Sequence, residues 1–169
     1  MNIVHKTLAS IGLAASLVSA AWGLPLVLPD PNQGGVESGS MSITADHEIA
    51  VSGSPISLTT SKPSSGDPRS GAATFKDGTL EFNDGATSLS GHISRVVLKT
   101  VTDADGSVSY ALSGVVYGTL DSAGGKRNVN GNFSVTTTPA AAGEANPDGA
   151  AVASSHLLVN PLPENHIAR

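Results

Sequence analysis

The sequence predicts an all-β protein, an antiparallel β-sandwich or small β-barrel of about eight strands that follows a Pro/Gly-rich N-terminal arm. Only 14% of the residues are charged, whereas 19 are glycine and 10 are proline, which favours turns and strands over helices. From residue 42 onward, short segments alternate small polar residues with β-branched or aliphatic ones. No apolar repeat with the helical period interrupts this alternation, so strands are expected throughout.

Residues 1–20 have the organisation of an export signal. A lysine is followed by an uncharged, mostly apolar run that ends in Val18-Ser19-Ala20, the small-x-small pattern of a signal peptidase site. We expect cleavage after Ala20, although cleavage after Ala21 or Gly23 would satisfy the same steric demand. The run is shorter than the roughly 20 residues of a spanning helix. An exported chain, periplasmic or extracellular, with no transmembrane anchor in its mature part is therefore expected.

The remaining chain divides into four segments by composition. Residues 21–40 form the Pro/Gly-rich arm, in which Leu24 to Leu28 could lie on the core. Residues 41–138 form the antiparallel β-domain. Residues 139–150 are an Ala/Gly/Pro linker, and residues 151–169 contain a C-terminal strand or a short helix, with the strand favoured, and a tail.

Charge and cysteine content exclude several classes of function. The net charge of −5 opposes electrostatic binding of nucleic acid or of an anionic membrane surface. The chain has no cysteine, which excludes a disulfide framework, thiol chemistry, Cys-ligated zinc and a lipidated cysteine.

The first half of the β-domain consists of short elements. Alternation predicts three strands, at Ser42–Thr44, Glu48–Val51 and Ile56–Thr60. Residues 61–71 contain no large apolar residue and are expected to form a surface loop. Asp77-Gly78 is the strongest short-range signal for a hairpin turn, so strands are expected at residues 73–76 and 79–82.

Three longer segments share a pattern in which a glycine lies two residues from a large apolar residue on each side. They are Leu89-Ser90-Gly91-His92-Ile93, Leu112-Ser113-Gly114-Val115-Val116 and Val129-Asn130-Gly131-Asn132-Phe133. Because side chains alternate along a strand, each glycine shares the inner face with its large neighbours. A four-residue loop at residues 121–124 predicts three inner pairs, Leu112 with Phe133, Gly114 with Gly131 and Val116 with Val129.

The preceding hairpin requires an irregularity. A turn at residues 103–106 sets Leu98 opposite Tyr110, but Ile93 would then point away from the core. A β-bulge near Ser94 or Arg95 restores the inner face. The predicted pairs beyond the bulge are Ile93 with Gly114 and Gly91 with Val116.

No catalytic, cofactor-binding or metal-binding residue is predicted. The chain lacks the Gly-x-Ser-x-Gly elbow, and His47-Glu48 has no second histidine at helical spacing. The mature histidines are expected to be solvated side chains, at His47, His92, His156 and His166.

Two sets of carboxylates suggest possible sites. Asp103-Ala104-Asp105-Gly106 begins like an EF-hand loop, but Gly114 stands where the bidentate glutamate belongs, and turn chemistry explains both aspartates. Glu48 and Glu81 are the only glutamates within predicted strands, which leaves a glycosidase pair open although nothing ties the two together.

Tyr117 is the aromatic residue that most suggests a binding surface. With Val115 it lies on the outer face beside Asn128 and Asn130, which together could form a small amphipathic patch. The alternative is that a second sheet or the Pro-rich arm covers this patch as ordinary core. The glycosylation sequon at Asn132 falls in mid-strand and is set aside.

These observations favour an exported, non-enzymatic β-domain that acts in binding or assembly at the cell envelope or surface. One alternative is a hydrolase of envelope polysaccharide or peptide with a dispersed site. Another is a fibre subunit whose N-terminal arm completes the sheet of a neighbour. The partner is unknown, and either self-association or a surface partner fits the sequence.

Overall fold

The structure is a computed structural model that describes residues 25–28 and 38–163. The predicted signal peptide, most of the arm and the end of the tail lie outside these residues. The described residues contain one 3-10 helix, η1 (Pro68–Ser70), and otherwise strands and their connections. The strands are β1 (Leu26–Leu28), β2 (Ser38–Ile43), β3 (Ile49–Ser54), β4 (Ile56–Thr60), β5 (Pro63–Asp67), β6 (Ala72–Asn83), β7 (Ser88–Thr102), β8 (Ser107–Ser122), β9 (Gly125–Thr137), β10 (Ala140–Ala141) and β11 (Val152–Pro161).

All of these strands belong to one antiparallel sheet, which confirms the predicted all-β class. The order along the 11-stranded sheet is β1-β11-β9-β8-β7-β6-β4-β3-β2, with β5 paired to β6 and β10 paired to β8. The strands beyond the expected number, about eight, are β1, β5 and β10, which have three, five and two residues.

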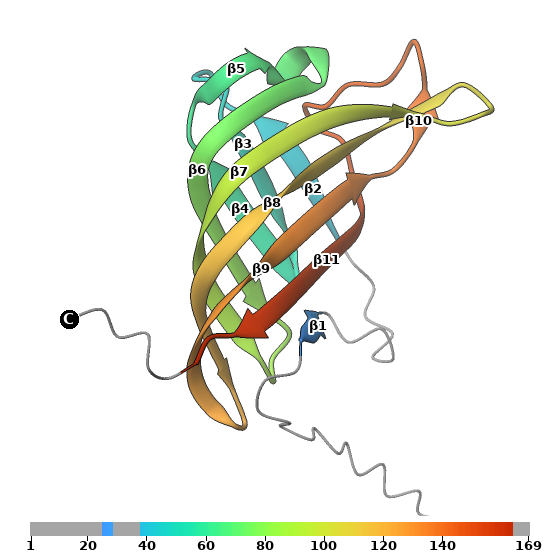
Figure 1. Ribbon diagram of the computed structural model, residues 1–169. Helices are drawn as coiled ribbons and strands as arrows, with labels where there is room; N and C mark the ends of the chain where they lie inside the picture. The colour runs from blue at the N-terminus through green and yellow to red at the C-terminus, as the bar shows by residue number, and fades with distance from the viewer. Residues whose placement is uncertain (1–24, 29–37, 164–169) are drawn as a thin grey trace, which may run out of the picture.

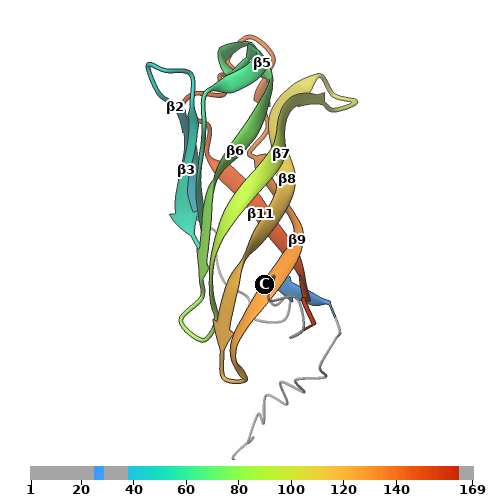
Figure 2. The same cartoon turned by 60° about the vertical axis from the view of Figure 1, so that its left-hand side comes forward.

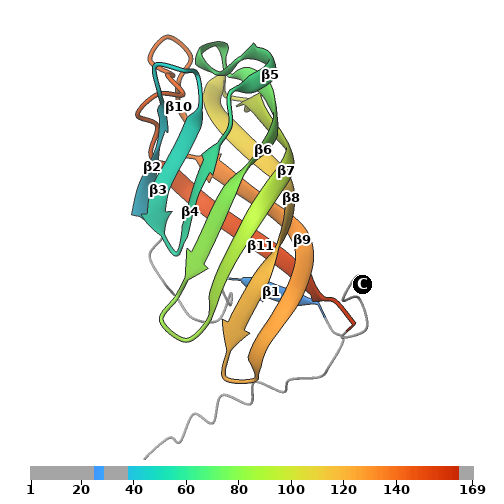
Figure 3. The same cartoon turned by 90° about the vertical axis from the view of Figure 1, so that its left-hand side faces the viewer.

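The sheet curls until its two halves face each other across one core, as in a sandwich. In Figure 3, β2, β3, β4 and β6 lie in front while β9 and β11 cross behind them. The edges meet only at one end, where the Met41 N–H donates to Ala150 O at 2.8 Å and the Gly149 N–H donates to Met41 O at 2.8 Å. The sheet does not close into a barrel.

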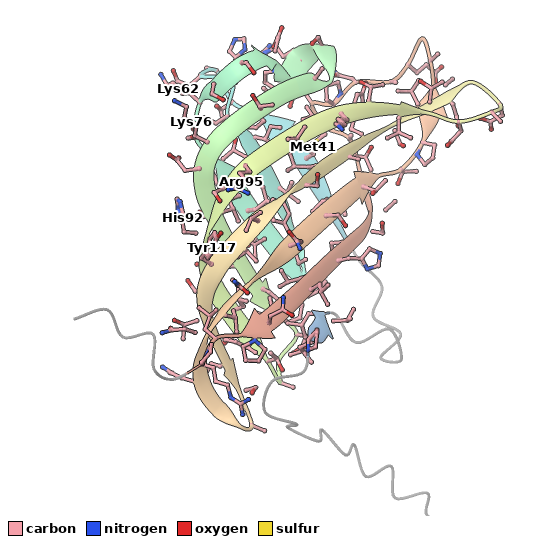
Figure 4. All side chains as sticks on the ribbon, in the orientation of Figure 1. Met41, Lys62, Lys76, His92, Arg95 and Tyr117 are labelled. Atoms are coloured by element: carbon pink, nitrogen blue, oxygen red, sulfur yellow. The ribbon has the colours of Figure 1, made fainter. Side chains whose placement is uncertain are left out.

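Apolar side chains fill the space between the two halves. Along β11, for example, Leu157 and Val159 are buried while the residues between and beside them are exposed. Phe75, Phe82 and Met41 are among the largest fully buried side chains, and Met41 lies between the halves in Figure 4. One face of every long strand therefore contributes to a single core.

The predicted hairpin at Asp77-Gly78 is wrong, because β6 runs without a turn through these residues. Both sides of this strand are paired, with β7 along one side and β4 and β5 along the other. Lys76 and Asp77 are both exposed, so the alternation of β6 shifts by one residue here. The Asp77 carbonyl accepts a hydrogen bond from the Ser61 N–H at 2.9 Å. Pairing with neighbours therefore overrides the local preference for a turn.

Residues 61–71 are not a simple loop, because they contain β5 and η1. β5 is exposed along most of its length and has no apolar face for alternation to reveal. Backbone pairing with β6 holds it, and the Ser64 hydroxyl donates to Thr74 O at 3.1 Å. An edge strand of this kind leaves no hydrophobic signature in the sequence.

The predicted bulge in β7 is confirmed. The β7–β8 register shifts between Ser94 and Val97, and Arg95 adopts a φ of 53°. The predicted pairs are wrong, because Ile93 lies opposite Val116 and Leu98 lies opposite Leu112. The same error affects the β8–β9 hairpin, whose loop is shorter than predicted because Ser122 pairs with Gly125. The observed pairs there are Leu112 with Val135, Gly114 with Phe133 and Val116 with Gly131.

The predicted inner faces are nevertheless correct. A register error of two residues returns each side chain to the same side of the sheet, since side chains alternate with a period of two. Val116 and Phe133, for example, are both buried as expected.

The C-terminal segment forms a strand, β11, which confirms the prediction of a strand over a short helix. β11 pairs with β9 along most of its length and contributes Leu157 and Val159 to the core. The preceding residues are attached to the sheet, because β10 pairs with β8 and the Thr138 N–H donates to Ala151 O at 2.8 Å.

Gly114 provides a test of the register. A Cβ atom added there would lie 2.7 Å from Cε1 of the buried Phe133 ring and 3.1 Å from Ser94 O. We expect Gly114→Val to lower the free energy of unfolding by about 1–3 kcal/mol through overpacking. The control is Gly143→Val, because a Cβ at that glycine meets nothing within 4 Å. Equal unfolding midpoints of the two variants in urea would show that Gly114 does not face Phe133.

Candidate functional site

The outer face of the central strands carries an exposed aromatic side chain among polar neighbours. Tyr117 on β8 is 48% exposed and lies opposite His92 on β7 and Asn130 on β9. Figure 4 shows His92 and Tyr117 on the same outer flank of the sheet, directed away from the core. We define the Tyr117 face as His92, Val115, Tyr117, Asn130 and Asn132.

The sequence places these residues outside because their strand neighbours are buried. Val116 is 0% exposed, and the alternation of a strand then directs Val115 and Tyr117 to the opposite side. One of the two asparagines opposite these residues differs from the prediction, since Val115 pairs with Asn132 and Tyr117 pairs with Asn130. This follows from the corrected β8–β9 register.

Asn128, which the sequence placed in the patch, lies opposite Thr119 instead. The Thr119 hydroxyl donates to Asn128 Oδ1 at 3.4 Å. Asn128 thus extends the polar surface along the strands and is diagonal to Tyr117 instead of directly opposite it.

The described part of the N-terminal arm does not cover Tyr117, contrary to the alternative considered above. β1 pairs with β11, two strands away from β8 in the sheet. The edge-on view in Figure 2 places β1 near the end of β11. The exposed fraction of Tyr117 leaves its ring accessible to a partner.

Three basic side chains lie above the Tyr117 ring, on β6, on β7 and in the β4–β5 connection. Figure 4 shows Lys62, Lys76 and Arg95 above His92 and Tyr117. Lys62 Nζ lies 2.8 Å from Asp46 Oδ1. This hydrogen-bonded ion pair lowers the pKa of the Asp46 carboxyl and raises the pKa of the Lys62 ammonium. The Tyr117 face itself offers amides, an imidazole and an aromatic ring.

The structure separates the predicted surface histidines. His47 Nδ1 lies 3.3 Å from Asp67 Oδ1, and this contact joins the β2–β3 turn to β5. His92 and His156 are exposed on β7 and β11, and His166 lies outside the described residues. Within the described part of the chain, no three metal-ligating side chains come together.

The Asp103–Gly106 turn uses its carboxylates internally. The Ser107 N–H and hydroxyl donate to Asp105 Oδ1 at 2.9 and 2.7 Å, and the same hydroxyl lies 3.3 Å from Asp103 Oδ2. Gly106 has a φ of 84°, which an L side chain rarely adopts. Asp103, Asp105 and Gly106 therefore form a turn, as the sequence predicted.

Glu48 and Glu81, the two glutamates of predicted strands, lie on separate elements. Glu48 precedes β3, and its N–H donates to Thr44 Oγ1 at 3.2 Å. Glu81 is exposed on β6 between Ser57 and Ser90. Their placement gives no geometric support to a joint catalytic role.

Two surface concavities lie at the ends of the sheet. One of about 380 Å³ lies between the start of β8 and residues 138–151, and its Asp148 carboxylate accepts the Ile43 N–H at 2.9 Å. The other, of about 410 Å³, lies between the β6–β7 and β8–β9 turns. Their lining consists largely of small residues and turn residues, so the Tyr117 face has the more distinctive chemistry.

Comparison with protein-family models, curated proteins and solved structures found no match to this chain. In the part of the chain that the structure describes, no helix is long and apolar enough to cross a membrane. The functional proposal therefore rests on the residues of this chain.

The Asp105 turn predicts a pH-dependent contribution to stability. Hydrogen bonds from the Ser107 N–H and hydroxyl lower the pKa of Asp105 below its usual 3.8. A lowered folded-state pKa stabilises the fold above the unfolded-state pKa, and the effect is lost as the pH falls through the folded value. We expect Asp105→Asn to lower the melting temperature at pH 7, and the difference from the parent to shrink as the pH is lowered below the usual range of an aspartate. Asp84→Asn serves as a comparison in another turn, and an identical melting temperature of Asp105→Asn and the parent at pH 7 would contradict this role.

Proposed function

We propose that the protein is an exported, non-enzymatic β-domain that binds an extended, uncharged polysaccharide of the cell envelope or surface through the Tyr117 face. The observation that carries the proposal is the half-exposed Tyr117 ring, held on a paired strand between His92 and Asn130. Export is supported by the signal-like organisation of residues 1–20.

The residue types suit a hydroxyl-rich ligand. An aromatic ring offers a flat apolar surface to the C–H face of a sugar, while the phenol hydroxyl stays available for a hydrogen bond. Asn130 and Asn132 each provide an amide that both donates and accepts, which matches the dual character of sugar hydroxyls. Tyrosine and asparagine together are also typical of surfaces evolved for recognition.

The shape of the site favours an extended ligand over an enclosed one. The Tyr117 face spans β7, β8 and β9, whose spacing of about 4.8 Å presents side chains in regular rows. The opposite face of the same strands is packed with large side chains such as Ile93, Val116 and Phe133. A chain laid across the strands could contact several rows at once.

The carbohydrate proposal predicts a specific loss upon truncation of the ring. Tyr117→Ala should weaken binding to insoluble, uncharged polysaccharide by about tenfold, or about 1.4 kcal/mol, in sedimentation assays with chitin and cellulose. Val101→Ala is the matched control, because Val101 is 39% exposed on another part of β7. Equal binding of the two variants would contradict the assignment of the site.

The same assay tests the competing hydrolase hypothesis. Soluble sugar released over time by the parent protein would contradict a non-enzymatic role, whatever the effect of Tyr117→Ala. Binding without release, and its loss in Tyr117→Ala but not in Val101→Ala, is the expected outcome.

A further inference from the structure

β1 is the strand at one end of the strand order. It pairs with β11 alone, through Leu26 with Val159, Val27 with Leu158 and Leu28 with Leu157. Leu28 is only 4% exposed and belongs to the core, and Leu26 packs against that core, whereas Val27 is 47% exposed. β1 therefore has one buried face and a defined register against β11.

The strand that follows β1 in the chain does not pair with it. β1 and β2 lie at opposite ends of the strand order, and residues 29–37 connect them. These residues include Pro29, Pro31 and the pair Gly34-Gly35. In Figure 1, β1 is a small separate element beside the end of β11. Among the described strands, β1 therefore pairs with a strand that is distant in the sequence and not with its neighbour β2.

We propose that the Leu26–Leu28 strand of a second copy of this chain occupies the β11 edge in place of the chain's own β1. The exchanged strand would make the same backbone pairs with β11 and bury the same leucines, because both copies have the same sequence. Exchange of an identical element between copies creates a dimer without requiring a new contact surface. The choice between the two arrangements then depends on the local concentration of the tethered strand relative to that of other copies.

The β11 edge needs a strand beside it because buried apolar side chains lie there. Leu157 and Val159 are both 0% exposed while β1 lies beside them. Without an occupant, the outer edge of β11 would present unpaired backbone groups next to these apolar side chains, which is a template for strand addition. Leu28 identifies the natural occupant, because it fills the adjacent part of the core.

The absence of cysteine allows a direct test by disulfide trapping. Val27 and Leu158 lie directly opposite each other and are 47% and 40% exposed. Opposed residues in an antiparallel pair have Cα atoms about 4.5–5.5 Å apart, within the range for a disulfide. Copies with Val27→Cys and copies with Leu158→Cys, given C-terminal tags of different mass, would be unfolded and refolded together under reducing conditions and then oxidised.

We expect a cross-linked heterodimer whose yield rises with protein concentration. The matched control replaces Leu158→Cys with Val101→Cys, an equally exposed position on β7, and should give a several-fold lower yield. Adding Leu28→Ser to the Val27→Cys copy should also lower the yield, because the strand then loses its buried leucine.

Two results would overturn the proposal. A yield no higher than that of the Val101→Cys control would show that β1 stays on its own β11. A predominant link between two Val27→Cys copies would show edge-to-edge association of β1 strands without exchange. Neither result depends on polysaccharide binding, so the test is independent of the Tyr117 face.

Discussion

The sheet of this protein has one continuous apolar face, and this face is buried only because the sheet bends back over itself. The described residues contain no helical layer that could cover it. Bending requires close approach of strands on the inner side, where Gly91 lies opposite Gly118 and Gly131 lies opposite Val116. A Cβ at Gly118 would lie 2.7 Å from the Gly91 Cα atom. The small inner residues and the bulge at Arg95 therefore permit the curvature on which the core depends.

The curvature also creates two surfaces with different chemistry. The outer side of the central strands stays open and displays Tyr117 between polar side chains. At the ends of the strand order, the sheet leaves two edges that meet only near Met41 and Ala150. A closed sheet would have no such edges. The outer face suits recognition of a partner, while the β11 edge suits the addition of a strand.

The proposed binding and assembly roles are compatible because they use separate strands. Tyr117 lies on β8, whereas Val27 and Leu158 pair at the β1–β11 edge. Exchange of β1 between copies would present more than one Tyr117 face in the same particle. Several weak sites in one particle bind a repetitive polymer more tightly than a single site does. Assembly would thus strengthen attachment to a polysaccharide without changing the Tyr117 face.

The sequence by itself determined the strand class, the inner residues of the long strands and the need for a bulge near Arg95, because alternation is a local property. Outward placement of Tyr117 followed from the same rule. Only the tertiary structure decided the pairing partners, since registers that differ by two residues bury the same faces. For that reason, Asn132 replaced Asn128 in the patch. Likewise, β5 and the straight course of β6 through Asp77-Gly78 arise from hydrogen bonds to neighbouring strands, which local residue preference does not encode.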